Sequence, residues 1–153
     1  GIQTETPAKV GDNADSVYKA ITKIEQNSGL PADGLVISPT DYEAFRLSKD
    51  GNKQYMGGGF FEGQYGAGGF VQQPPLWGLR TVVTPAIAAG TVLVGAFSMA
   101  ATLYRKGGVR VEATNSNATD FTSNLVTIRA EERIALAVRQ PLGFCKLTLS
   151  ATP

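Results

Sequence analysis

A long alternation of apolar and polar residues near the C-terminus constrains the fold more than any other feature of this sequence. Successive side chains of an extended chain point to opposite faces, so every second residue shares a face. One face of the run would carry Val126, Ile128, Ala130, Ile134, Leu136 and Val138. The other face would carry Thr127, Arg129, Glu131, Arg133 and Arg139. The pattern predicts a half-buried β-strand of about fourteen residues, more than twice the usual length.

A helix is the alternative for this run. Helical spacing would place Leu125, Ile128 and Glu132 on one face. It would also place Arg129 and Arg133 four residues apart, where like charges repel one another. We therefore favour the strand.

One carboxylate, Glu132, interrupts the apolar face of the predicted strand. A charge on such a face is costly unless it is paired. Residues 102–104 and 109–112 precede it and predict a hairpin around a turn at residues 106–108. Arg110 of this hairpin is our candidate partner for Glu132.

Two helices are predicted in the first fifty residues. The first has an apolar face with helical spacing. This face comprises Ala14, Val17, Ile21 and Ile24. Asp12 or Asn13 can cap the start of the helix, and Gly29 followed by Pro31 ends it.

The second helix follows a short buried strand at residues 35–37. Ser38 is its predicted cap, Pro39 its first residue, and Asp41 completes a capping box. The helix should reach about Ser48. Later strands are expected at residues 76–79, 81–83, 91–94 and 147–149, with Trp77 as a core anchor. Helices and strands together indicate an α+β fold.

Composition excludes several classes of function. A net charge of +1 is too small for a dedicated nucleic-acid binder. The absence of histidine removes the Ser-His-Asp and Cys-His catalytic arrangements and most zinc sites, so we expect no enzyme, metal or cofactor. The single cysteine, Cys145, lies in an apolar run and is interpreted as a core residue. The apolar stretch at residues 85–101 is too short to span a membrane, and the polar start contains no signal peptide.

A glycine-rich segment lies at residues 57–73, where seven glycines alternate with aromatic side chains. The aromatic residues are Phe60, Phe61, Tyr65 and Phe70. No Lys-Ser or Lys-Thr follows the glycines, which argues against a phosphate-binding loop. The segment is either a linker or a loop whose aromatic side chains contact neighbouring subunits.

Five segments in a fixed order carry a resemblance to a known family. They are ISPTDYEAFRLSKDGN at 37–52, LWGLRTVVTP at 76–85, TVLVGAF at 91–97, VRVEAT at 109–114 and NLVTIRAEERIALAVRQP at 124–141. In this order they resemble the major capsid proteins of tailed bacteriophages, which have the Hong Kong 97-type fold. The resemblance covers nearly the whole chain.

The resemblance implies a particular domain arrangement. Residues 1–97 and 142–153 would form the axial domain, and residues 98–141 part of the peripheral domain. In such proteins the opening Gly-Ile-Gln-Thr lies well inside the polypeptide, after an N-terminal arm, an extended loop and a spine helix. We therefore expect this chain to be a C-terminal fragment, with its glycine-aromatic loop near the five-fold or six-fold centre of a capsomer.

The resemblance also implies a function, the formation of an icosahedral shell by self-assembly into pentamers and hexamers. Implied partners are further copies of the chain, scaffold, portal and other virion proteins, and packaged DNA through weak non-specific contacts. The protein would reside in the virion after assembly in the host cytoplasm, with no membrane involved. An encapsulin-type compartment shell and a stand-alone binding domain are the alternatives.

Some members of this family join their subunits by isopeptide bonds between a lysine and an asparagine, assisted by a glutamate. The matching positions here are Asn124 and Glu131, whereas the lysine would lie on the extended loop that this chain lacks. The structural alternative makes Asn124 a turn residue and pairs Glu131 with Arg129 or Arg133. We favour this alternative.

Overall fold

The computed structural model describes residues 1–49, 51–53 and 75–150, which belong to two compact units. The first unit comprises Gly1–Ala100 and Arg139–Pro153, and the second comprises Ala101–Val138. These limits lie close to the predicted boundaries at 97/98 and 141/142. The assignment of the units as axial and peripheral domains stays a prediction.

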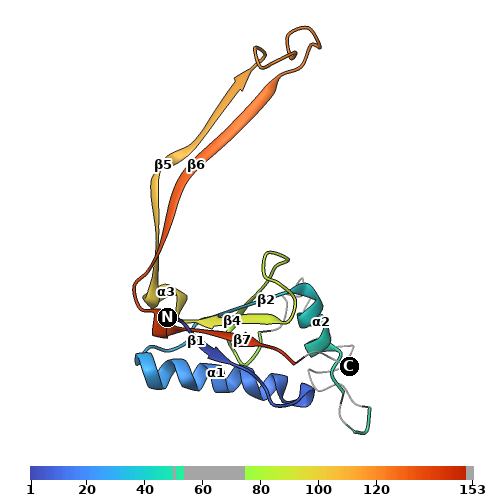
Figure 1. Cartoon of the computed structure of the whole chain (residues 1–153), viewed down its shortest axis with the longest axis vertical. Coiled ribbons are helices and arrows are strands. Elements are labelled where there is room, and N and C mark those ends of the chain that lie inside the picture. The colour runs from blue at the N-terminus through green and yellow to red at the C-terminus, as the bar shows by residue number, and fades with distance from the viewer. Residues whose placement is uncertain (50, 54–74, 151–153) are drawn as a thin grey trace, which may run out of the picture. The chain divides into compact units, whose positions relative to one another are not determined.

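The first unit is built on a five-stranded mixed sheet with the strand order β1-β7-β4-β2-β3 (Figure 1). Its strands are β1 (Gln3–Glu5), β2 (Gly34–Ile37), β3 (Arg80–Val83), β4 (Thr91–Gly95) and β7 (Phe144–Thr148). The outer pairs β1–β7 and β2–β3 are parallel, while β4 is antiparallel to both of its neighbours. The first and last strands of the chain therefore lie side by side.

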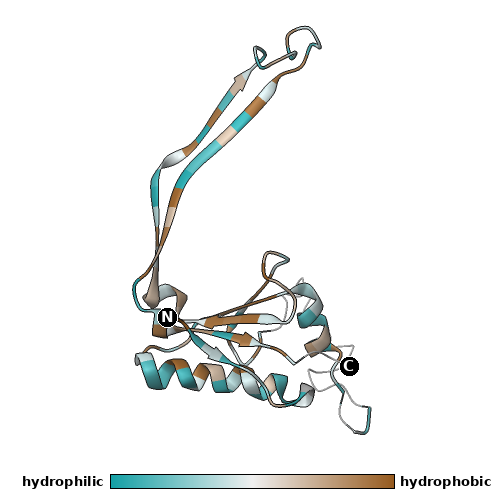
Figure 2. Ribbon diagram, in the orientation of Figure 1, coloured by the Kyte–Doolittle hydropathy of each residue, from teal (hydrophilic) through white to brown (hydrophobic). Residues whose placement is uncertain are grey.

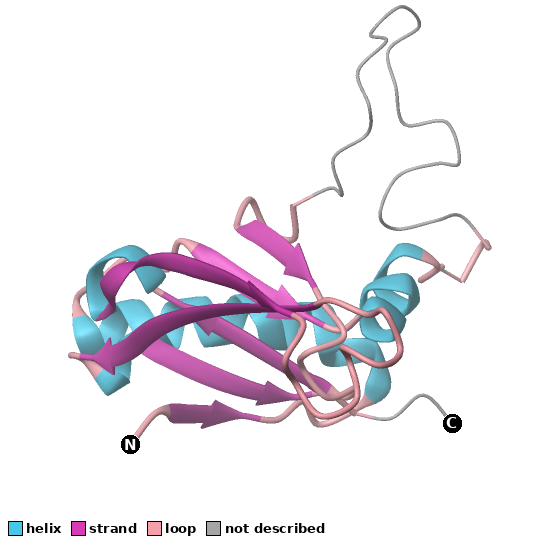
Figure 3. Ribbon diagram, turned by 90° about the horizontal axis from the view of Figure 1, so that it is seen from above, coloured by secondary structure: helices cyan, strands magenta, loops and turns pink. Residues whose placement is uncertain are grey.

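Helix α1 (Asn13–Ser28), which follows a 3-10 turn η1 (Val10–Asp12), lies along one face of this sheet (Figure 3). Gly29 ends it with a left-handed φ of 69°, and its N–H donates to the Glu25 carbonyl at 3.0 Å. This confirms the predicted end of the helix. The apolar face is buried at Val17, Ala20, Ile21 and Ile24.

Alternate residues of the central strands complete the core beneath α1. They are Leu35, Ile37, Val92, Val94, Cys145 and Leu147, all fully buried. Cys145 is thus a core residue, as predicted. Burial raises the pKa of its thiol, which keeps the sulfur protonated and poorly nucleophilic.

The predicted capping box at the start of α2 (Pro39–Arg46) is present. The Ser38 hydroxyl accepts from the Asp41 N–H at 3.1 Å and donates to the Asp41 carboxylate at 2.8 Å. The same carboxylate accepts from the Gly90 N–H at 2.8 Å, which ties the helix to the turn before β4. The helix ends at Arg46, slightly before the predicted Ser48.

The prediction of a strand at residues 76–79 is wrong. Trp77 and Gly78 both have positive φ values, 51° and 74°, and the Leu79 N–H donates to the Leu76 carbonyl at 3.0 Å. Two successive left-handed residues make a tight turn and are incompatible with an extended strand. Trp77 is 52% exposed and so does not anchor the core.

The second unit is a two-stranded antiparallel hairpin of β5 (Ala101–Thr114) and β6 (Thr127–Val138). The long strand β6 is confirmed. The turn predicted at residues 106–108 is wrong, because β5 continues through it with a register shift between Lys106 and Arg110. Gly107, with a φ of 77°, makes this an irregularity within the strand, while the loop at residues 115–126 connects the two strands.

Asp33 holds the short helix α3 (Phe97–Ala100), which directly precedes β5 in the chain. One oxygen of its carboxylate accepts from the Phe97 N–H at 2.7 Å. The other accepts from the Ser98 N–H at 2.9 Å and from the Ser98 hydroxyl. Partial burial alone would raise the pKa of Asp33, but these hydrogen bonds outweigh it and hold the pKa below its ordinary value.

The lowered pKa predicts how the Asp33 contribution depends on pH. We expect Asp33→Ala to lower the free energy of unfolding of the unassembled protein by about 1 kcal/mol at neutral pH, as for other lost helix caps. The contribution is fully present above the unfolded-state pKa, roughly 3.9, and is lost as the pH falls through the lower folded-state pKa. Urea unfolding of both proteins over a pH series should show the difference narrowing below about pH 4. Asp33→Asn, which keeps one acceptor oxygen but does not titrate, is the control. It should lower the free energy of unfolding by less than Asp33→Ala does, and its remaining contribution should not change with pH in this way.

Candidate assembly surfaces

One face of the hairpin carries most of its large exposed apolar side chains. Directly opposed residues such as Leu103 and Leu136 point to the same side, so the register defines this face. Its large members are Leu103, Val111, Ile128, Ile134, Leu136 and Val138, which are 45 to 69% exposed. We call these six residues the apolar hairpin face. Figure 2 shows hydrophobic bands alternating with hydrophilic ones along both strands of the hairpin.

The prediction that the long strand is half-buried is therefore wrong for the second unit by itself. A sheet of two strands has no second layer, and the apolar hairpin face has no cover within this unit. Burying each such side chain would stabilise a complex by about 1.5–3 kcal/mol. An isolated hairpin is at best marginally stable in water, so this face requires a partner surface from elsewhere.

The opposite face of the hairpin is charged. Glu112 pairs with Arg129 of the neighbouring strand at 2.5 Å and also with Arg110 of its own strand. Arg129 in turn lies 3.8 Å from Glu131. These side chains are largely exposed, so each pair contributes little to stability, and the face is suited to water.

Glu132 interrupts the apolar hairpin face, as predicted, and has an arginine partner there. That partner is Arg105, whose Nε lies 3.5 Å from the carboxylate, and the Glu132 side chain is only 29% exposed. Arg110, the partner predicted from the sequence, is instead opposite Glu131 and pairs with Glu112. Arg110 shares the charged face with Lys106, which opposes Arg133, so its side chain is directed away from the face that carries Glu132.

Asn124 and Glu131 lie apart within the chain. Asn124 has a left-handed φ of 52° in the loop before β6, and its N–H faces the Phe121 carbonyl at 3.4 Å. Glu131 is inside β6, about 13 Å of extended chain beyond Thr127. The turn at Asn124 and the Arg129 pairing of Glu131 agree with the structural alternative.

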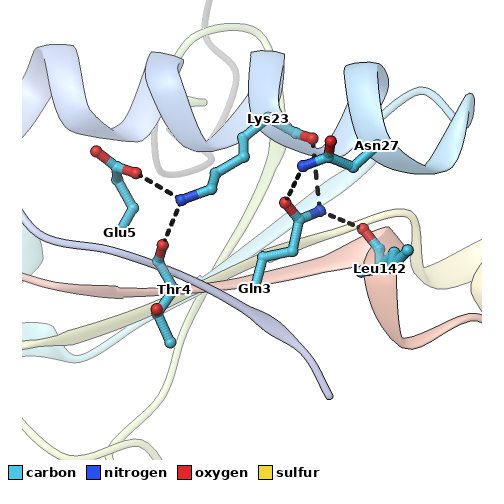
Figure 4. A network of polar contacts seen from close by, with 6 residues as sticks. All are labelled: Gln3, Thr4, Glu5, Lys23, Asn27 and Leu142. Carbon is cyan, nitrogen blue, oxygen red and sulfur yellow. Dashed lines mark hydrogen bonds and ion pairs between the residues drawn. The ribbon is translucent and has the colours of Figure 1, made fainter.

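A polar clamp at the edge of the first sheet was missed by the sequence analysis (Figure 4). The Gln3 amide, almost completely buried, donates to the Leu142 carbonyl at 2.6 Å and accepts from Asn27 at 2.6 Å. Lys23 donates to the Thr4 carbonyl at 2.6 Å and pairs with a carboxylate oxygen of Glu5 at 3.0 Å. The clamp fixes β1 to α1. No periodic signal marks it, because isolated polar residues meet there from three distant segments.

Neither histidine chemistry nor a candidate metal site is found in the ranges that the structure describes. The chain contains no histidine, and no three potential metal ligands gather among the described residues. None of the described helices combines the length and the apolar character needed to cross a membrane. The predicted contact loop with Phe60, Phe61, Tyr65 and Phe70 lies outside the described residues.

The model of the phage capsid family matches residues 1–149. This chain belongs to the phage capsid family. The chain is 35% identical to the major capsid protein of Enterobacteria phage HK97 over 138 residues, which are 90% of this chain and 34% of that protein. The chain thus spans about a third of the length of this curated capsid protein.

Solved capsid structures share the fold. The chain superposes on a structure from Gordonia phage Cozz with a TM-score of 0.69 and 16% identity, covering 99% of this chain and 50% of that one. A capsid of a native GTA particle computed with C5 symmetry gives a TM-score of 0.70 and 16% identity, and the match covers 99% of this chain and 50% of that one. The α+β, Hong Kong 97-type fold predicted from the sequence is confirmed.

The uncovered apolar hairpin face leads to a prediction for the full-length protein. Leu136→Asp places a charge where we expect a partner surface, because a buried unpaired carboxylate is strongly unfavourable. We expect the full-length variant to remain folded but to yield at least tenfold fewer particles, as measured by sedimentation.

The neighbouring Ala135→Asp is the matched control, since Ala135 is also exposed but points to the charged face. Its particle yield should stay near that of the unmodified protein. Equal losses for the two variants would contradict the assignment of the faces.

Glu132 gives a second prediction for these faces. Because Arg105 is 64% exposed in the described unit, Glu132→Gln should change the stability of the unassembled protein by less than about 1 kcal/mol. In assembled particles the pair would be covered, and removing one partner then leaves an unpaired charge. We expect a clearly lower melting temperature for the variant particles in calorimetry. Adding Arg105→Gln should partly restore it, and unchanged particles would argue against a buried pair.

Proposed function

We propose that this chain is the C-terminal part of a major capsid protein that builds the icosahedral shell of a tailed phage or prophage. Membership of the capsid family over residues 1–149 carries the proposal. The 35% identity to a major capsid protein supports it. The role is structural, not catalytic, which accords with a chain that lacks histidine.

Function in such a shell depends on geometry. The first unit would serve as the axial wedge that meets its copies around five-fold and six-fold centres. The hairpin of the second unit would be a brace whose apolar face is covered on assembly. Many modest interfaces, repeated by symmetry, can give a wall considerable strength.

The proposed partners follow from this role. Copies of the chain form pentamers and hexamers, and scaffold, portal and other virion proteins would contact the shell. Packaged DNA would touch the wall only weakly, since a net charge of +1 offers little attraction for phosphates. Assembly would take place in the cytoplasm of the bacterial host and end in the virion.

Expression of the complete reading frame tests the proposal. We expect closed particles of uniform diameter in negative-stain electron microscopy, built from pentamers and hexamers. A full-length product that stays monomeric at high concentration would refute the proposal. An encapsulin-type shell would also form particles, and a neighbouring gene for a cargo enzyme, instead of portal and terminase genes, would identify it.

The same particles decide whether subunits are joined covalently through Asn124 and Glu131. The structural alternative predicts monomer bands alone on a denaturing gel. A ladder of multiples that disappears in Asn124→Ala particles would establish an isopeptide bond instead.

A further inference from the structure

Trp77 has a backbone conformation that bulky residues rarely adopt. Its φ of 51° and that of Gly78, 74°, are those of a type I′ turn, in which Asn or Gly usually occupies the first central position. A large side chain in the left-handed region is strained, and such strain is concentrated at functional positions. Trp77 therefore calls for an explanation beyond making the turn.

Local contacts hold the indole at the surface. Its N–H donates to the Ala14 carbonyl at 2.9 Å, and its ring lies 5.2 Å from the ring of Tyr18, tilted by 57°. Trp77 and Tyr18 are nevertheless 52% and 54% exposed. We call these two residues the aromatic pair. Preoriented, half-exposed Trp and Tyr side chains are typical of the energetic centres of protein interfaces.

A hollow of about 440 Å³ lies on the other side of the same sheet. Val36 and Val82 are register partners and point away from the face that α1 covers, since Leu35 and Ile37 point toward α1. Phe97 borders the hollow, with its ring so close to Gly34 that a Cβ there would meet it at 2.9 Å. The volume is within the range of pockets that seat ligands, about 300–1,000 Å³.

The charges beside the two features are complementary. Arg80 lines the hollow and is exposed. Asp15 is exposed on α1, three residues before Tyr18, which places it beside the aromatic pair. Within the part of the chain that the structure describes, neither Arg80 nor Asp15 forms an ion pair.

We propose that the aromatic pair of one subunit seats in the hollow of the next subunit of the same capsomer, with Asp15 facing Arg80. The inference rests on the proposed shell function. A ring requires a contact between two different surfaces of the same subunit, and the aromatic pair and the hollow lie on opposite sides of one sheet. A second copy of this chain is therefore the occupant.

Cross-linking tests the contact in full-length particles. Asp15→Cys combined with Arg80→Cys replaces two surface charges, while the natural Cys145 is buried. A short bis-maleimide should join the introduced cysteines into a ladder that ends at five or six subunits. Each single variant should give monomers. Asp15→Cys with Lys146→Cys is the matched control, because Lys146 points to the same open face but lies beyond β2 and β4.

A second measurement applies if the double variant does not assemble. Trp77 is the only tryptophan of this chain, so its fluorescence can be followed. Subtracting the fluorescence of the Trp77→Phe variant removes the contribution of any tryptophan elsewhere in the full-length protein. On assembly of otherwise unmodified protein, we expect its emission to shift to shorter wavelength and its quenching by acrylamide to fall at least twofold.

The outcomes separate the two proposals. A cross-linked ladder or a protected Trp77 supports the contact. Particles in which no ladder forms above the Lys146 control, or in which Trp77 stays as quenchable as in free subunits, overturn the contact and leave the shell function intact. A full-length protein that forms no particles overturns both.

Discussion

A hairpin of two strands cannot cover its own apolar face, and this constraint connects the structure of the chain to its role. The β5–β6 hairpin places Ile128, Ile134 and Leu136 together on one side, where they stay exposed. Such an exposed apolar face is unfavourable in a free monomer. In an assembly, contact with another subunit would remove it from water and so stabilise each copy. In a member of the phage capsid family, the exposed apolar face would be explained by its burial against other subunits on assembly.

The first unit contrasts with the hairpin because it contains its own core. Alternate residues of β2, β4 and β7 pack beneath α1, and polar contacts secure the edges of the sheet. Gln3 ties the edge strand β1 to α1, and Asp33 holds the start of α3. In the proposed shell this unit would act as a wedge, whose two sheet faces would present different surfaces to neighbouring copies.

Two features of the chain are energetically costly by themselves: an ion pair on an apolar face and a bulky residue in a strained turn. Glu132 and Arg105 form an ion pair that interrupts the apolar hairpin face. Trp77 is a bulky residue that has a left-handed backbone conformation in a tight turn. Buried charge pairs seldom add stability, but they can fix the register of the surface that covers them. A preoriented tryptophan likewise restricts which surface can dock against it. In the proposed shell both features would favour one arrangement of subunits over others.

Local patterns were sufficient wherever neighbours in the chain decide the structure. The spacing of Val17, Ile21 and Ile24 predicted α1, Gly29 predicted its end, and Ser38 with Asp41 predicted the cap of α2. The alternation from Val126 to Val138 predicted the long strand and the polar interruption at Glu132. These signals suffice because helix caps and strand faces depend on residues only a few positions apart.

Tertiary structure decided what depends on residues far apart in the chain. Gly107 and Gly108 resemble a hairpin turn locally, but pairing with β6 extends β5 through them and places Arg110 opposite Glu131, on the face away from Glu132. The large apolar side chain of Trp77 is typical of a core residue. Its left-handed turn and the hydrogen bond from its indole N–H to the Ala14 carbonyl nevertheless place it at the surface. The sequence by itself determined helices α1 and α2, the long strand β6 and the apolar faces of these elements. Whether each face is covered was decided only by the tertiary arrangement, because burial depends on a second surface that no local pattern specifies.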